Sequence, residues 1–212
     1  MDRSAQVFFR KAAVTDIDPV WRIILQAKEQ MRLLGSRQWQ DGYPALDDIR
    51  RDIADGCGYV LAAGNVPVAY GAVLFGGEPA YGSIEGEWLC QPPYVVVHRL
   101  AVAQEMRRCG LATRFMREVE TFARNAGLHS FRVDTNFDNR YMRSLLSALG
   151  FYPTAVRFSM RTEAAGLMKN RCETRTVFVC RGCAGLIFSL HLDKSVFTGH
   201  FTGSAPDTPG QK

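Results

Sequence analysis

The sequence predicts an α/β fold of the α+β kind, a mixed sheet with helices on both of its faces. Two observations support this prediction. Residues 58–64 and 68–75 are short apolar stretches joined at Asn65, a pattern typical of an antiparallel hairpin. Residues 94–136 then show strand, helix and strand patterns in turn, which indicates a βαβ unit with parallel strands. Antiparallel pairing at one edge and parallel pairing in the middle therefore belong to one sheet.

The expected elements follow one another without an internal repeat. Predicted helices have apolar residues at helical spacing and stop at or near a glycine. Predicted strands are rich in β-branched and aromatic residues. In chain order we expect strand 7–12, a helix capped by Thr15 or Asp16 and ended by Gly35, loop 36–44, helix 46–54, strands 58–64 and 68–75, a short strand near 83–89, strand 94–102, helix 111–126, strand 130–136, a helix capped by Asp138 and ended by Gly150, and strands 156–160 and 175–180 as a last antiparallel pair.

A basic turn follows the predicted central strand YVVVHRLAV (94–102) and leads into a helix. In MRRCGLATR (106–114), Gly110 allows the first N–H groups of that helix to point outward together. These groups and the helix dipole form a binding place for an anion. Arg107 and Arg108 add planar donors that match phosphate oxygens. The turn predicts a pyrophosphate site, and without GK[ST] or GxGxxG it disfavours nucleoside triphosphates and NAD.

Arg107-x-x-Gly110-x-Ala112 resembles the [QR]-x-x-G-x-[GA] signature of the GNAT superfamily of N-acetyltransferases, where it binds the pyrophosphate of acetyl-CoA. The preceding RLAV and the later VDTNFDNRYMRSLLSALGF (133–151) are similar to the family's flanking strand and helix. The resemblance covers roughly residues 7 to 160 and is greatest to small bacterial acetyltransferases of loosely assigned substrate. It implies a mostly antiparallel sheet with a central, parallel strand pair that splays apart.

The resemblance also implies where acetyl-CoA binds, with no metal. The pantetheine arm is expected between the strand ending at Val102 and its neighbour at Asp134, bonded to main-chain groups. A solvated pair is the alternative for the two arginines of the turn, and a cap or turn residue is the alternative for Asn139. The expected cofactor-binding residues are Leu100, Ala101, Val102, Arg107, Arg108, Cys109, Gly110, Leu111, Ala112, Thr113, Asn136 and Asn139.

Attack of an amine on a thioester needs a base and a donor for the oxyanion. We favour His98 as the base, because strand alternation places it on one face with Leu100 and Val102. A hydrogen-bonded core histidine is the alternative reading. Glu85 and Glu87 are the next candidates for the base.

The family often places a tyrosine acid seven residues after its asparagine, and this chain has Leu146 there. The leading hypothesis is an acetyl-CoA-dependent N-acetyltransferase acting on a primary amine of a small molecule or protein. The missing tyrosine motivates an alternative, a catalytically silent acyl-CoA-binding module. Trp39, Tyr43 and Trp88 are expected to line the acceptor pocket.

Composition limits the remaining classes. The net charge of +5 and the pI near 9.0 favour an anionic partner. The basic residues cluster at one turn and no recognition motif accompanies them, so nucleic acid is the weakest candidate. No apolar run approaches the length of about 20 residues that spans a bilayer. The first residues, MDRSAQVFFRKAAV, do not show the long apolar stretch of a signal peptide, and we expect a cytoplasmic protein.

The last part of the chain departs from the family pattern. We expect an acetyltransferase core over 1–160, an extension over 161–200 that completes or packs on the core, and a disordered tail over 201–212. The apolar run 177–190 predicts packing on its own domain or a homodimer contact. A zinc site is disfavoured, because only one short-spaced pair occurs among Cys172, Cys180, Cys183, His191 and His200.

Overall fold

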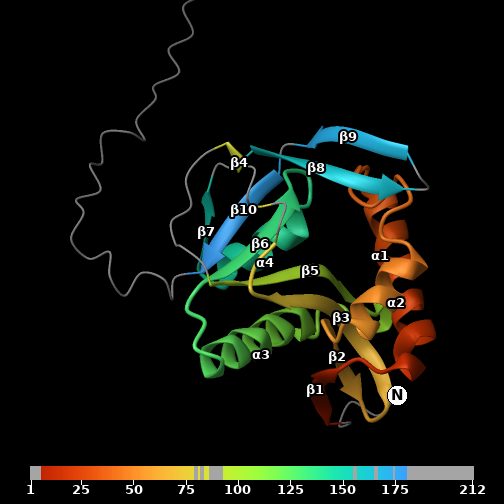
Figure 1. Cartoon of the computed structure of the whole chain (residues 1–212). Helices are drawn as coiled ribbons and strands as arrows, with labels where there is room; N and C mark the ends of the chain where they lie inside the picture. Colours follow the sequence, from red (N-terminus) through yellow and green to blue (C-terminus); the bar gives the residue numbers. More distant parts are fainter. Residues whose placement is uncertain are drawn as a thin grey trace, which may run out of the picture.

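In the computed structural model, helices cover both faces of a seven-stranded mixed sheet (Figure 1). The structure describes residues 6–78, 81, 84–85, 93–154, 157–164, 167–173 and 175–180. Across the sheet, the strands follow the order β1 (Val7–Lys11), β2 (Gly58–Ala63), β3 (Val66–Phe75), β5 (Val95–Val102), β6 (Phe131–Asn136), β10 (Arg175–Cys180) and β7 (Phe151–Thr154). The expected hairpin is confirmed, since β2 and β3 pair antiparallel through the turn at Gly64-Asn65.

The parallel pair at the centre of the sheet is bonded only at its start. Val95 lies opposite Phe131 and Val96 opposite Arg132, and no later residues of β5 and β6 pair. Every other strand pair in the described ranges is antiparallel. The mostly antiparallel sheet with one splayed parallel pair is therefore confirmed, and the splay opens toward the carboxyl ends of β5 and β6.

Two helices pack on each face of the sheet, which confirms the predicted layering. Helices α1 (Ile17–Leu33) and α2 (Leu46–Ala54) contribute the buried Ile24 and Ile49 to one core. Helices α3 (Leu111–Asn125) and α4 (Arg140–Ala148) contribute Phe115 and Leu146 to the core on the other side. Short 3₁₀ turns, η1 (Val14–Asp16) and η3 (Gln104–Met106), precede α1 and α3.

The predicted cap of α4 was wrong by one residue. The residue before the helix is Asn139, and its Oδ1 accepts the N–H of Met142 at 3.1 Å. Asp138 lies one residue too early for this bond, and its Oδ2 accepts the backbone N–H of Arg37 at 3.2 Å. Both side chains are good helix caps, so the sequence pattern did not separate them.

The predicted pairing of 156–160 with 175–180 was also wrong. Strand β10 lies between β6 and β7 and pairs antiparallel with both. Strand β8 (Arg157–Ala164) pairs instead with β9 (Leu167–Glu173) and with β4 (Ile84–Glu85) in a second, three-stranded sheet. The hairpin of β8 and β9 separates the two segments, and the chain between them lacks the apolar alternation that reveals a strand.

The division of the chain at residues 160 and 200 stays a prediction, and the tail beyond Cys180 lies outside the described residues. Of the helices in the described ranges, none combines the length and the apolar composition that crossing a bilayer requires.

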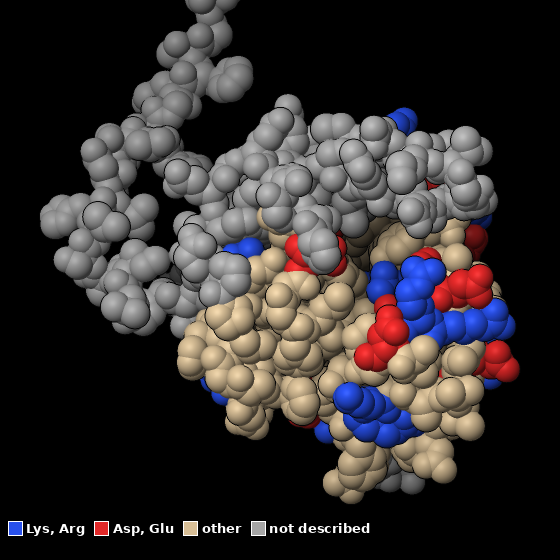
Figure 2. Space-filling view, in the orientation of Figure 1, with Lys and Arg blue, Asp and Glu red and all other residues tan. Residues whose placement is uncertain are grey.

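The face drawn in Figure 2 carries charges of both signs, gathered over α1 and α2. Exposed pairs on these helices join Arg32 with Glu29 and Arg50 with Asp47, at 2.7 and 2.9 Å. Basic side chains on this face are therefore interspersed with acidic ones. A continuous basic surface, as nucleic-acid binding requires, does not cover this face.

Candidate active site

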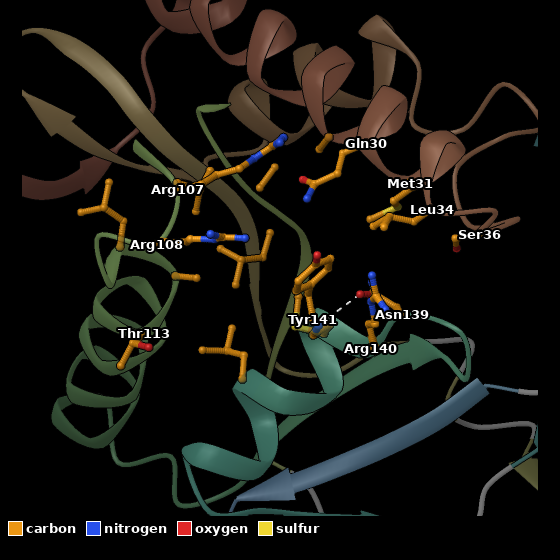
Figure 3. Close-up of a pocket in the computed structure, with 18 of the residues that line it drawn as sticks. Gln30, Met31, Leu34, Ser36, Arg107, Arg108, Thr113, Asn139, Arg140 and Tyr141 are labelled. Atoms are coloured by element: carbon orange, nitrogen blue, oxygen red, sulfur yellow. Dashed lines mark hydrogen bonds between the residues drawn. The ribbon is translucent and has the colours of Figure 1, made fainter. Parts of the chain in front are cut away.

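A cavity of about 780 Å³ lies where β5 and β6 have splayed apart (Figure 3). Four elements contribute to it: the end of α1, the end of β5, the basic turn with the start of α3, and the start of α4. Its lining residues include Gln30, Met31, Leu34, Leu100, Ala101, Val102, Met106, Arg107, Arg108, Gly110, Leu111, Ala112, Thr113, Asn139, Arg140, Tyr141 and Leu145. Ten of the twelve residues that the sequence predicted for the cofactor are among them; Cys109 and Asn136 are not.

The N-terminus of α3 faces this cavity and is built for an anion. Gly110 precedes the helix with a φ of 75°, a conformation that glycine adopts without strain. The N–H groups of Leu111, Ala112 and Thr113 have no carbonyl partner within the helix, as in the first turn of any α-helix. The positive end of the helix dipole therefore meets the cavity at unbonded donors.

The arginines of the basic turn have different surroundings. Arg107 donates to the carbonyl oxygen of Gln26 in α1 at 3.3 Å, and burial lowers the pKa of its guanidinium. Arg108 extends across the cavity toward Tyr141 (Figure 3). Arg114 is turned away, donating to the carbonyl oxygen of Val7. Arg107 and Arg108 are thus the two arginines of the turn that line the cavity.

Asn139 lies at the edge of the cavity with both ends of its amide engaged. Its oxygen caps α4, and its nitrogen donates to Oε1 of Gln38 at 2.8 Å. The cap reading of this residue is therefore confirmed, and contact with the cofactor stays a prediction. Cys109 is exposed, with its thiol near the carbonyl of Arg107, and Asn136 ends β6 with a buried Oδ1 that has no hydrogen-bond partner.

A bulge in β5 changes which side chains share a face. His98 lies opposite Ala72 and Ala101 opposite Tyr70, so Gly71 of β3 faces two residues of β5, Arg99 and Leu100. The expectation that His98 shares a face with Leu100 and Val102 was therefore wrong. Leu100 and Val102 pack with the α3 core, whereas Ala101 belongs to the α1 core. The extra residue reverses the alternation after His98.

His98 lies between two carboxylates. Its Nε2 is 2.8 Å from Oε2 of Glu78, and its Nδ1 is 3.5 Å from Oδ1 of Asp134. Tyr81 donates its hydroxyl to the same oxygen of Asp134 at 2.6 Å. The side chains of His98, Glu78 and Asp134 are 12%, 18% and 2% exposed, so a small route to solvent remains at the first two. Both ring nitrogens of His98 therefore lie close to carboxylate oxygens.

A second buried polar cluster surrounds Arg99, the residue of β5 that follows His98. Arg99 binds the carboxylate of Asp52 through two nitrogens, at 2.8 and 2.5 Å, and a third nitrogen donates to the hydroxyl of Tyr43. Tyr70 donates its hydroxyl to Asp52 at 2.6 Å. Burial, and then the charge of Asp52, raise the pKa of Tyr70, so that phenol stays protonated and remains a donor.

Sequence analysis did not find Glu78, Tyr81, Asp52 or Arg99. Glu78 and Tyr81 occupy a turn-rich stretch, where patterns say little about position. Asp52 offered a signal, since it is an acidic residue on the apolar face of a short helix and is 5% exposed in the fold. A carboxylate is kept in such a place by a paired cation.

The other predicted residues separate into three cases. Trp39 is buried in the α1 core, and Tyr43 bonds to Arg99, so neither lines the cavity. Glu85 belongs to β4, and only its backbone is described. Glu87 and Trp88 lie outside the described residues. The roles of all five stay predictions.

A model of the acetyltransferase (GNAT) family matches residues 22–151, which is more than half of the 212 residues of the chain. The chain belongs to the GNAT family. The matched range holds both splayed strands, and it includes the end of β5, the basic turn and the start of α4, which line the cavity. The resemblance stated from the sequence is thus confirmed.

Solved GNAT structures share this architecture. An acetyltransferase of the family from Streptococcus agalactiae 2603 has a TM-score of 0.67 at 29% identity, over 82% of this chain and 94% of that one. A PaiA N-acetyltransferase from Thermoplasma acidophilum, solved in complex with coenzyme A, has a TM-score of 0.58 at 11% identity, over 82% and 98% of the two chains. The second likeness shows the fold alone.

An aminoglycoside N(6')-acetyltransferase type 1 from Acinetobacter genomosp. 13 is 34% identical over 62 residues, or 29% of this chain. The match spans 42% of the length of that curated relative. In the part of the chain that the structure describes, no group of three or more His, Cys, Asp or Glu side chains is arranged to hold a metal ion.

Proposed function

We propose that this chain transfers the acetyl group of acetyl-CoA to a primary amine of a small molecule or a protein. The observation that supports it most is the cavity at the splay, where N–H groups of the first turn of α3, two arginines and the end of β5 that does not pair with β6 converge. The N–H groups and the arginines suit a pyrophosphate, and the end of β5 suits an extended arm with amide groups. The volume of about 780 Å³ leaves room for a ligand of this size.

For the cofactor, we propose that Arg107, Arg108 and the first turn of α3 bind the pyrophosphate. The main chain of Leu100 and Val102 would bond to the pantetheine arm, because a strand that has left its neighbour has N–H and C=O groups to offer. The arm would then deliver the thioester to the start of the splay, near Val96 and His98.

For the chemistry, the neutral amine attacks the thioester carbon, an oxyanion forms, and the C–S bond breaks to release the thiolate of CoA. We propose that His98 receives the proton of the amine, directly or through water, with Glu78 bonded to its other side. Leu146 is fully buried and apolar where the family often has a tyrosine acid. The thiolate leaves without an acid, which is tolerable near neutral pH.

The test is to incubate the purified full chain with acetyl-CoA and a panel of amines, and to follow acetylated products by mass spectrometry. The panel includes a diamine, an aminoglycoside, and peptides with a free N-terminus or lysine. Mass spectrometry is preferred to a thiol reagent, because the exposed Cys109 of the protein would react with one.

Calorimetry with acetyl-CoA separates the outcomes. Binding with formation of an acetylated amine supports the proposal. Binding without a product from any amine supports the alternative, a catalytically silent acyl-CoA-binding module, which the apolar Leu146 favours. Absence of binding at millimolar acetyl-CoA contradicts both.

A further inference from the structure

We propose that the buried Arg99–Asp52 pair is a positioning device for acetyl transfer. The pair holds the bulge of β5, and the bulge presents the backbone of Leu100 and Ala101 to the cavity. The inference rests on the proposed function, and it concerns residues that lie outside the cavity lining. Neither Arg99 nor Asp52 is among the residues that line the cavity, so the pair would act through β5, whose end does line it.

The bulge places Arg99 in a backbone conformation that needs support. Its φ is +57°, in the left-handed region that side chains other than glycine rarely adopt. Such a residue stays in place when its surroundings over-determine it. Opposite it, Gly71 has no side chain, and a Cβ there would lie 2.8 Å from the ring of Phe115. The backbone on both sides of the bulge is therefore tightly constrained.

Three other segments meet at the side chain of Arg99. Asp52 comes from α2, Tyr43 from the loop before α2, and Tyr70 from β3. Tyr70 is also the residue that pairs with β5 directly after the bulge, opposite Ala101. The hydrogen bonds Arg99–Asp52 and Tyr70–Asp52 therefore join the two strands on one side of the bulge through a single carboxylate.

The bulge separates the two halves of the site. His98, before Arg99, faces Glu78 at 2.8 Å. Leu100 and Ala101, after it, line the cavity. A change in the backbone at Arg99 thus moves the proposed proton-accepting group and the backbone that would bind the pantetheine arm relative to each other. In general, a displacement of about 1 Å lowers rates by as much as about a hundredfold.

The decisive experiment compares two ion pairs that each hold a buried carboxylate through two nitrogens of an arginine. Asp52→Asn removes the charge from the Arg99 pair. The matched control, Asp16→Asn, removes it from the pair of Arg10 with Asp16, which is also bound through two nitrogens, at 2.6 and 3.0 Å. The carboxylates are 7% and 3% exposed, and neither residue lines the cavity.

Both variants are expected to melt at a lower temperature than the wild type. With an amine found in the panel, and well below either melting point, Asp52→Asn is expected to lower kcat by at least about tenfold. Its KM for acetyl-CoA should stay within about threefold, because the pyrophosphate site is untouched. Asp16→Asn should leave kcat within about twofold. Equal values of kcat in the two variants would overturn the proposal.

A milder variant serves if Asp52→Asn does not fold. Tyr70→Phe removes one hydrogen bond to Asp52 and keeps the ring, and Tyr59→Phe is its control in the neighbouring strand β2. Tyr70→Phe is expected to lower kcat by about three- to tenfold, and Tyr59→Phe to leave it unchanged. If kcat is unchanged in both Tyr70→Phe and Tyr59→Phe, the proposal is contradicted.

Failure of the proposed function is distinguishable from failure of this inference. If no amine is acetylated, hydrogen exchange still tests whether the Arg99–Asp52 pair holds the bulge of β5. The amides of residues 99–103 should exchange at least about tenfold faster in Asp52→Asn than in Asp16→Asn, with equal exchange in α3. Unchanged exchange at residues 99–103 would then contradict the role of the Arg99–Asp52 pair and leave the proposed function untouched.

Discussion

Three arginines that the sequence presents together, Arg107, Arg108 and Arg114, do three different things in the fold. Arg107 bonds to α1, Arg108 crosses the cavity, and Arg114 bonds to the backbone of Val7. A cluster of cations at a helix N-terminus is unfavourable, because the helix dipole is positive there. Turning Arg114 away reduces that repulsion, and an anion in the cavity would remove the remainder.

Replacing Arg107 and Arg108 by alanine together is expected to weaken acetyl-CoA binding strongly. Each charge-assisted hydrogen bond contributes about 1.5–3 kcal/mol, which corresponds to at least about tenfold in affinity for each arginine. Calorimetry measures the change. The control is Arg50→Ala with Arg51→Ala on α2, which removes the same charge from exposed positions. Equal affinities in the two double variants would contradict the site.

His98→Ala is expected to lower turnover by about 10²–10⁴-fold and to remove the acidic limb of the pH–rate profile. If His98 must be neutral to receive the proton, activity rises with pH in the wild type and then levels off. Acetyl-CoA affinity should change little, because His98 does not line the cavity.

The control for His98 is His129→Ala, at an exposed histidine after α3. A core-packing role for His98 predicts another pattern: a lower melting temperature with an unchanged pH profile. Glu78→Gln adds a second comparison, since it keeps the shape of the partner of His98 and removes its charge. A profile that keeps its acidic limb in His98→Ala would refute the base assignment.

At the scale of elements, the start of α3 has two requirements, a left-handed residue and an open approach for the ligand. Gly110 and Gly127 flank the helix with the same φ of +75°, and neither has an atom within 4 Å of an added Cβ. The two positions are therefore alike in backbone strain. Only Gly110 lines the cavity.

Gly110→Ala and Gly127→Ala are expected to lose equal stability, about 1–2 kcal/mol each, because alanine is strained at this φ. Only Gly110→Ala should weaken acetyl-CoA binding, because its Cβ lies where phosphate oxygens approach the N–H groups. Thermal unfolding and calorimetry on the same samples measure both quantities. Equal acetyl-CoA affinities in the two variants would place the pyrophosphate elsewhere.

For the whole molecule, acid stability depends on the pair that joins β1 to the start of α1. Burial acts to raise the pKa of Asp16, but hydrogen bonds from Arg10 and from the N–H of Ala13 lower it overall. Because the pKa of Asp16 is lower in the folded state, the pair stabilises the fold at pH values above the unfolded pKa of about 4. That contribution is lost as the pH falls through the lower, folded value.

Asp16→Asn is accordingly expected to cost about 1–3 kcal/mol at pH 7, since Arg10 is 36% exposed and is partly solvated by water. The difference in melting temperature from the wild type should shrink as the pH falls below about 4. Calorimetric melts from pH 7 to pH 3 measure this. A difference that stays constant across the range would show that the charge of Asp16 is not the cause.

The helices, the hairpin, the parallel unit and the basic turn could all be predicted from the sequence. Each of these follows from local rules: apolar periodicity, glycine stops, and donors gathered at one helix start. Ten of the twelve residues predicted for the cofactor line the cavity, and the sequence could point to them because they are contiguous in the chain or belong to a known signature. Residues that are close together in the chain are also close together in the fold, so a sequence shows such a group directly.

The tertiary structure alone decided which partners meet across the sheet. The bulge at Arg99 depends on the register of β3, and the place of β10 depends on which strands lack a neighbour. Asp52, Tyr70 and Arg99 are separated by 18 to 47 residues, and they meet only because the fold brings the side chain of Asp52 in α2 to those of Tyr70 in β3 and Arg99 in β5. A buried charge needs a partner, but no local pattern names a partner so far along the chain, so the positioning of the site was visible only in the fold.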